Sequence, residues 1–200
     1  MTMSALIINI LKFAPSHINT NEMKKILFTI VLLSIVILIL SPSAAQENKP
    51  NYDVFSFEQQ LILPGTTTQI YDAMTGDISG WWDHSFSEKP YKLYIDPIPG
   101  GGFYEIFNAG GDGVKHATVI YSDRGKMLRF DGPLGLSGKA IQMVTPYEFF
   151  EAGPDSTTLK LSVHGSGEME EGMPATIESV WHHFLFERFK PYIESGKFKK

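Results

Sequence analysis

The sequence predicts an α+β domain in which a curved antiparallel sheet of about seven strands surrounds one long C-terminal helix. Three observations carry this prediction. Apolar and polar residues alternate over most of residues 52–164, and turn-forming residues separate the runs, as in an antiparallel meander. Helical patterns lie near the two ends of this region rather than between the strands. The last pattern is the longest and has one apolar face.

An apolar leader comes before this domain. Lys24 and Lys25 precede an uncharged run at 26–40, and the small residues Ser43 and Ala45 follow it. As a helix this run would span roughly 22 Å, short of a hydrocarbon core of about 30 Å. These features are typical of a secretory signal peptide. We therefore expect cleavage after Ala45 and an exported, periplasmic or secreted protein without a stable membrane anchor.

The expected organisation of the chain follows from this leader. Residues 1–45 form the signal peptide, and Met23 is a candidate for the true start because it would itself open a well-formed signal. A short linker is expected at 46–51 and a single domain at 52–196, followed by a tail at 197–200. A domain of this size can bury one core without covalent staples.

The composition excludes several classes of function. The chain carries 17 Lys and Arg against 22 Asp and Glu, a net charge of −5, and shows no basic cluster of the kind that nucleic-acid binding requires. It contains no cysteine, so neither disulfides nor a cysteine-linked lipid anchor is expected. The sequence does not determine the oligomeric state.

The individual elements can be placed in order. The first strand is expected at 53–63, and a helix begins at Pro64 and ends before Gly76. A second short helix is expected to carry Trp81 and Trp82. Turns such as "PGGG", "AGGDG" and "AGPDS" bound the remaining strands. These strands are expected near 91–96, 102–108, 114–122, 126–131, 140–150 and 157–164.

The closing helix is expected at about 174–190. With about 100° per residue, one face carries an apolar stripe interrupted by a single arginine. Arg188 must either hold an anionic group of a ligand or pair with an acidic side chain of the protein. The stripe consists of Ile177, Val180, Trp181, Phe184, Leu185 and Arg188.

Several segments together resemble a known group of proteins. They are the "WW" pair, the glycine turn in "PGGGFYEIF", the strands "HATVIY" and "LRFDGPLG", and the closing "VWHHFLFERFKPYI". In this order they resemble the helix-grip (START-like) SRPBCC superfamily, in particular its polyketide-cyclase-like and heat-shock-ATPase-activator-like branch. The resemblance spans about residues 52–194 and implies a deep apolar cavity between sheet and helix. The superfamily includes binding proteins, lipid carriers and enzymes, so the fold does not select a function.

The segment "GDISGWWDHSF" raises the question of a ligand site. Neighbouring helical residues point about 100° apart, so Trp81 and Trp82 cannot both face the same neighbour. We expect one tryptophan in the core and the other at the rim of the cavity. Asp83 and His84 would then lie near the helix end, where one role is only to cap and solvate it. If the rim tryptophan lines an entrance, His84 is the polar group that would meet a ligand there.

The strand "FYEIF" offers two alternatives. If Phe103 and Phe107 point inward, Glu105 is a carboxylate in an apolar cavity, where desolvation raises its pKa towards that of a general acid or base. If they point outward, Tyr104 is the cavity residue instead. Glu105 and His116 lie on neighbouring strands and form the best acid-base pair in the sequence, although a single strand histidine is more often structural.

These patterns favour an exported protein that binds an apolar or amphipathic small molecule. An enzyme of cyclase, dehydratase or hydrolase type that uses Glu105 and His116 is the first alternative, and a protein-interaction module is the second. No cofactor is expected, and no metal either, because His182 and His183 diverge on the last helix. The expected ligand contacts are Trp81, Trp82, His84, Phe103, Tyr104, Phe107, Phe130, Met143, Trp181, Phe184 and Arg188.

Overall fold

The computed structural model describes residues 19–40 and 51–198, which belong to two separate compact units. In the first unit the expected leader forms α2 (Thr20–Leu40). Among the described helices, none combines the length and the apolar composition that a membrane crossing requires. The predicted cleavage after Ala45 lies outside the described residues.

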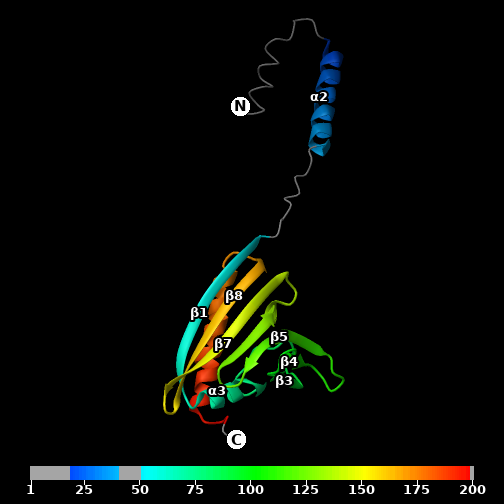
Figure 1. The fold of residues 1–200 in the computed structure, drawn as a ribbon. Coiled ribbons are helices and arrows are strands. Elements are labelled where there is room, and N and C mark those ends of the chain that lie inside the picture. Colours follow the sequence, from blue (N-terminus) through cyan, green and yellow to red (C-terminus); the bar gives the residue numbers. More distant parts are fainter. Residues whose placement is uncertain (1–18, 41–50, 199–200) are drawn as a thin grey trace. The chain divides into compact units, whose positions relative to one another are not determined.

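The second unit is built on one antiparallel sheet of eight strands, in the order β1-β8-β7-β6-β5-β4-β3-β2 (Figure 1). The predicted α+β class with a large antiparallel sheet is therefore confirmed. One strand more than expected is present, because β2 extends the edge next to β3. The strands are β1 (Tyr52–Pro64), β2 (Gly76–Asp77), β3 (Lys92–Ile95), β4 (Gly102–Ile106), β5 (Gly113–Asp123), β6 (Met127–Gly132), β7 (Ile141–Gly153) and β8 (Ser156–Glu168).

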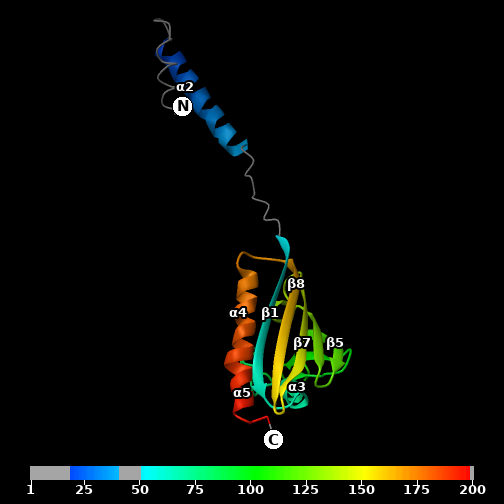
Figure 2. The same cartoon turned by 60° about the vertical axis from the view of Figure 1, so that its left-hand side comes forward.

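The C-terminal helix is one continuous helical segment, as predicted. It consists of α4 (Met173–His182), the π-helical stretch η2 (His183–Phe189) and α5 (Lys190–Glu194). Figure 2 shows this segment alongside β1 and β8, and the side-chain amide of Gln59 donates to the carbonyl of Glu178 at 2.8 Å. The apolar stripe faces the sheet, since its members Ile177, Trp181, Phe184 and Leu185 are buried.

The helix after β1 is shorter than predicted. Pro64 still belongs to β1, and α3 (Thr67–Met74) begins only after Thr66. The Thr66 hydroxyl accepts the Gln69 N–H at 3.3 Å, while the Gln69 side chain accepts the Thr66 N–H at 2.9 Å. This reciprocal capping satisfies two backbone donors that the first turn of a helix leaves free.

The prediction of a second short helix that carries Trp81 and Trp82 is wrong. The N–H groups of Trp81 and Trp82 both donate to the carbonyl of Ile78, at 3.1 and 2.9 Å, and this single turn does not continue. Gly76 adopts a φ of +68°, which directs the chain into the sheet edge as β2 and leaves few residues for a helix. Trp81 therefore lies in a turn and Trp82 in the loop that follows it.

The inner face of the sheet supplies the core. On β8 the side chains of Leu159, Leu161 and Val163 are fully buried, in the period of two that a half-buried strand requires. On β1 the side chains of Leu61 and Leu63 join the same core. This core holds the C-terminal helix and the sheet as the two walls of the candidate site.

Candidate functional site

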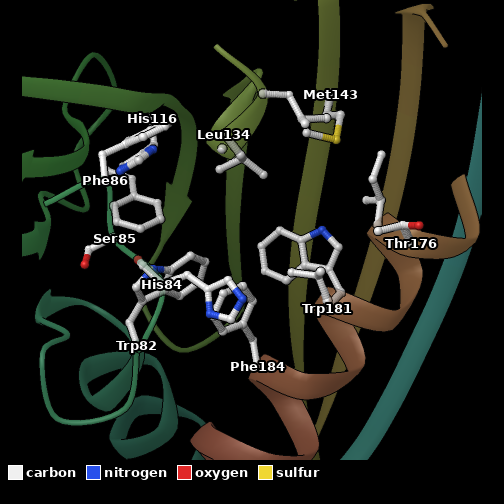
Figure 3. A pocket seen from close by; sticks show the side chains of 15 residues that line it. Trp82, His84, Ser85, Phe86, His116, Leu134, Met143, Thr176, Trp181 and Phe184 are labelled. Atoms are coloured by element: carbon white, nitrogen blue, oxygen red, sulfur yellow. The ribbon is translucent and has the colours of Figure 1, made fainter. Parts of the chain in front are cut away.

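A pocket of about 300 Å³ lies between the sheet and the C-terminal helix. Figure 3 shows its walls: Trp82, His84 and Phe86 on one side, Leu134 and Met143 near the strands, and Trp181 and Thr176 on the helix. Most of the lining side chains are apolar or aromatic. The lining comprises Trp82, His84, Ser85, Phe86, Phe103, His116, Leu134, Gly135, Leu136, Met143, Thr176, Ile177, Val180, Trp181 and Phe184.

The tryptophan pair divides between core and pocket. Trp81 is only 3% exposed and packs edge-on against Phe189 with a centroid distance of 4.8 Å. Trp82 stacks on Phe184 at 3.7 Å, and its indole N–H donates to the carbonyl of His84 at 2.6 Å. Trp82 thus forms part of the pocket wall and also orders the loop that follows it.

The buried carboxylate of Glu105 anchors this loop. Its Oε2 accepts the N–H of Phe86 and its Oε1 accepts the N–H of Ser87, both at 2.9 Å. Oε2 also lies 3.2 Å from Nε2 of His116. Both oxygens of Glu105 therefore have protein donors, and the side chain is fully buried behind the pocket wall instead of lining the pocket.

A β-bulge brings His116 to the pocket. On β5, Ala117 pairs with Phe103 and Lys115 pairs with Tyr104, so His116 is the extra residue between them. A bulge interrupts the alternation of faces and re-aims a side chain. His116 and Ala117 are accordingly both buried. This irregularity, rather than simple cross-strand pairing, allows His116 to reach Glu105.

Aromatic rings hold the His116 ring in place. The ring of Phe86 stacks on it at 5.4 Å with an interplanar angle of 8°, and Phe103 packs against it at 4.7 Å. Phe86 itself is 56% exposed, so it forms a lip of the pocket. The imidazole is thus fixed in the wall by two rings and one carboxylate.

The predicted direction of the Glu105 pKa is wrong. Desolvation is the largest single influence and raises this pKa, as expected from burial. The backbone N–H groups of Phe86 and Ser87 and the side chain of His116 together lower it by more, so the pKa of Glu105 lies below its ordinary value. Glu105 is therefore a stabilised carboxylate rather than a proton donor near neutral pH.

Several other residues named from the sequence do not line the pocket. Tyr104 lies on the opposite face of β4, where its ring stacks on Tyr94 at 5.2 Å and the ammonium group of Lys115 approaches it. The expectation that Phe107 lies in the cavity is wrong because it follows the end of β4. Phe130 is buried in the core against Tyr147, next to the pocket rather than in its lining.

Arg188 pairs with an acidic side chain of the protein, the second of the two roles expected for it. Its Nε lies 3.1 Å from Oδ2 of Asp83, and it also donates weakly to the carbonyl of Trp81 at 3.4 Å. Asp83 further contacts His84 and His183. The carboxylates of Glu187 and Asp83 raise the pKa of His183. An ionic cluster therefore joins the tryptophan loop to the C-terminal helix beside the pocket.

The remaining pocket residues were not named as contacts from the sequence. Ile177 and Val180 lie on the apolar stripe, so the helical period would have identified them. Ser85 and Phe86 lie in a loop and carry no periodic signal. Leu134 begins the short 3₁₀ helix η1 (Leu134–Leu136) with a φ of +52°, a conformation that sequence patterns do not indicate for leucine.

Comparisons with known proteins support the fold alone. No known protein family and no curated protein matches the chain. A solved structure of an uncharacterized protein from Rhizobium leguminosarum aligns with a TM-score of 0.55 at 11% identity, over 74% of this chain and 99% of that one. A protein of unknown function from Staphylococcus aureus (SA2116) aligns with a TM-score of 0.51 at 16% identity, over 74% of this chain and 98% of that one. The protein Mll3558 from Rhizobium loti aligns with a TM-score of 0.52 at 17% identity, over 71% of this chain and 99% of that one. These similarities fit a helix-grip-like fold.

Proposed function

We propose that this protein binds an apolar or amphipathic small molecule in the pocket between the sheet and the C-terminal helix. The observation that carries the proposal is the pocket itself, which has a volume of about 300 Å³ and a mostly aromatic and aliphatic lining. Binding sites for small molecules typically begin at this size and combine an apolar lining with a few polar groups. Here His84, Ser85, His116 and Thr176 are the polar side chains.

The arrangement of Glu105 favours binding over catalysis. Its two oxygens already accept two backbone N–H groups and lie next to His116, so its hydrogen-bonding capacity serves the loop at 85–87. A general base must reach the proton that it abstracts. Glu105 lies outside the pocket lining and does not meet this requirement.

A matched pair of helix variants tests the proposal. Val180 lines the pocket and is half-buried, whereas its neighbour Ser179 is exposed and outside the lining. We expect Val180→Phe to project a larger side chain into the pocket and to weaken the binding of an apolar fluorescent probe at least ten-fold, while Ser179→Phe leaves this binding unchanged. Equal probe affinity in both variants and the unchanged protein would rule out this pocket as the binding site.

A catalytic role is the second candidate, and one observation favours it. The bulge at His116 sets its imidazole in the pocket wall with a buried carboxylate 3.2 Å from Nε2, as in a base oriented by an acid. In a cyclase, dehydratase or hydrolase, His116→Ala would retain ligand affinity and lose turnover by about 10²- to 10⁴-fold. Chemically unchanged ligand after prolonged incubation with the protein would exclude this role.

We also propose that the chain belongs to the START-like SRPBCC superfamily and is exported. The order of strands and the C-terminal helix support the first statement. Lys24 and Lys25 ahead of the apolar part of α2 support the second. N-terminal sequencing of the exported protein should begin at Gln46. A full-length chain that stays in carbonate-washed membranes would contradict cleavage.

A further inference from the structure

We propose that Asp83, His84 and His183 form a binding site for a divalent transition metal ion of the zinc class, at the mouth of the pocket. Each residue offers one ligand atom, and the three atoms lie within 4.8 Å of one another. The inference goes beyond the proposed function and does not depend on which small molecule enters the pocket.

The distances fit a compact site. Oδ1 of Asp83 lies 2.9 Å from Nδ1 of His84 and 3.1 Å from Nε2 of His183. Zinc binds imidazole nitrogen and carboxylate oxygen at about 2.0–2.2 Å, so tetrahedral ligand atoms are about 3.3 Å apart. Both nitrogen–oxygen distances are a few tenths of an ångström shorter than that spacing, and all three ligand atoms lie within 4.8 Å of one another, so side-chain adjustments would bring them around an ion.

Glu187 provides a second, independent feature of a metal site. Its Oε2 lies 2.9 Å from Nδ1 of His183, the geometry in which Nδ1–H donates to the carboxylate. Histidine ligands of metals commonly donate their second ring nitrogen to a carboxylate, which fixes the tautomer and leaves the other nitrogen free to bind. Glu187 thereby presents Nε2 of His183 towards Asp83.

The local charge is compatible with a cation. Asp83 and Glu187 bring two negative charges, and the guanidinium of Arg188, 3.1 Å from Oδ2 of Asp83, brings one positive charge. With neutral imidazoles the group keeps a net negative charge. Arg188 occupies one side of the carboxylate and leaves Oδ1, which faces His84 and His183, as the oxygen available to an ion.

The ligand set also indicates the kind of ion and its surroundings. Two imidazoles and one carboxylate suit zinc and its neighbours better than calcium or magnesium, which prefer oxygen ligands. Three protein ligands leave the fourth tetrahedral position open. Because His84 also lines the pocket, the proposed metal site adjoins the pocket.

The spacing of Asp83, His84 and His183 along the chain does not indicate a metal site. His182 and His183 are adjacent on the helix and diverge, a pattern that predicts no metal site. The partners of His183 lie about one hundred residues earlier in the chain, on the loop after Trp82. Only the docking of that loop on the helix brings the three side chains together.

Zinc titration of the full chain, purified without a polyhistidine tag and stripped with a chelator, tests the proposal. We expect one Zn²⁺ per chain, an increase of the melting temperature on zinc addition, and Co²⁺ absorption bands typical of a low-symmetry nitrogen and oxygen site. His84→Ala and His183→Ala should each weaken Zn²⁺ binding at least ten-fold, and Glu187→Gln by about 10- to 100-fold.

His182→Ala is the matched control, since His182 is the neighbour of His183 on the helix and stacks on Phe186 instead. This variant should keep the affinity of the unchanged protein for Zn²⁺. Circular dichroism without metal verifies that each variant is folded. Equal Zn²⁺ affinity in the unchanged protein and the double variant of His84→Ala with His183→Ala would overturn the proposal, and so would equal losses in His182→Ala and His183→Ala.

Discussion

Glu105→Gln should destabilise the protein, because this glutamate on β4 anchors the loop that contains Phe86 and Ser87. The carboxylate is fully buried and accepts the N–H groups of Phe86 and Ser87, both at 2.9 Å. Glutamine keeps one acceptor oxygen and turns the other into a donor, so one backbone N–H loses its acceptor. His116 loses a charged partner at 3.2 Å in the same step.

The magnitude follows from these contacts. Hydrogen bonds to charged groups contribute about 1.5–3 kcal/mol, and an unsatisfied buried donor costs about 1–3 kcal/mol. We therefore expect Glu105→Gln to lower the free energy of unfolding by about 3 kcal/mol. For a domain of this size, such a loss corresponds to a fall of roughly 6–12 °C in the melting temperature.

Urea unfolding of the full chain, monitored by tryptophan fluorescence, measures this loss. Glu88→Gln is the matched control because Glu88 is an exposed glutamate in the same loop. Its free energy of unfolding should change by less than about 0.5 kcal/mol. If Glu105→Gln and Glu88→Gln unfold at the same urea concentration, the carboxylate does not anchor the loop and the reasoning is refuted.

Three further predictions follow from the same geometry. The pKa of Glu105 is lowered in the folded state, so the ionised carboxylate stabilises the fold fully above the unfolded pKa of about 4.3, and this stabilisation is lost as the pH falls through the lower folded pKa. The difference in free energy of unfolding between the unchanged protein and Glu105→Gln, measured by urea unfolding, should therefore shrink below about pH 4. A Cβ at Gly132 would lie 2.7 Å from Cα of Ala117 in the bulged strand, so Gly132→Ala should cost about 1–3 kcal/mol in the same assay, whereas Gly135→Ala, with open space around it, should be neutral. Trp82→Ala should weaken binding of an apolar probe by about 1–3 kcal/mol in a fluorescence titration, and a loss confined to Trp81→Ala would contradict the assignment of Trp82 to the pocket wall.

The regular elements could be predicted because their periods are intact. The stripe at Ile177, Trp181 and Phe184 predicted the buried face of the C-terminal helix, and the strand expected near 157–164 corresponds to β8, on which Leu159 and Leu161 are buried. These features depend on burial repeated at fixed spacing, which a sequence displays directly.

The site could be predicted only in part because its key features break those periods. The extra residue at His116 shifts the register of β5, and no residue type signals a bulge at this position. The lowered pKa of Glu105 depends on the N–H groups of Phe86 and Ser87, which a loop brings from elsewhere in the chain. The contact between Asp83 and His183 likewise requires the tertiary fold.

The proposed binding of a small molecule is tested most directly by native mass spectrometry of the protein isolated from the cells that produce it. We predict an apolar or amphipathic molecule bound one to one in the unchanged protein and in Ser179→Phe, and its absence from Val180→Phe, whose larger side chain would occupy part of the pocket of about 300 Å³. A mass that corresponds to the bare chain in all three proteins, together with no saturable binding of apolar probes, would contradict the account.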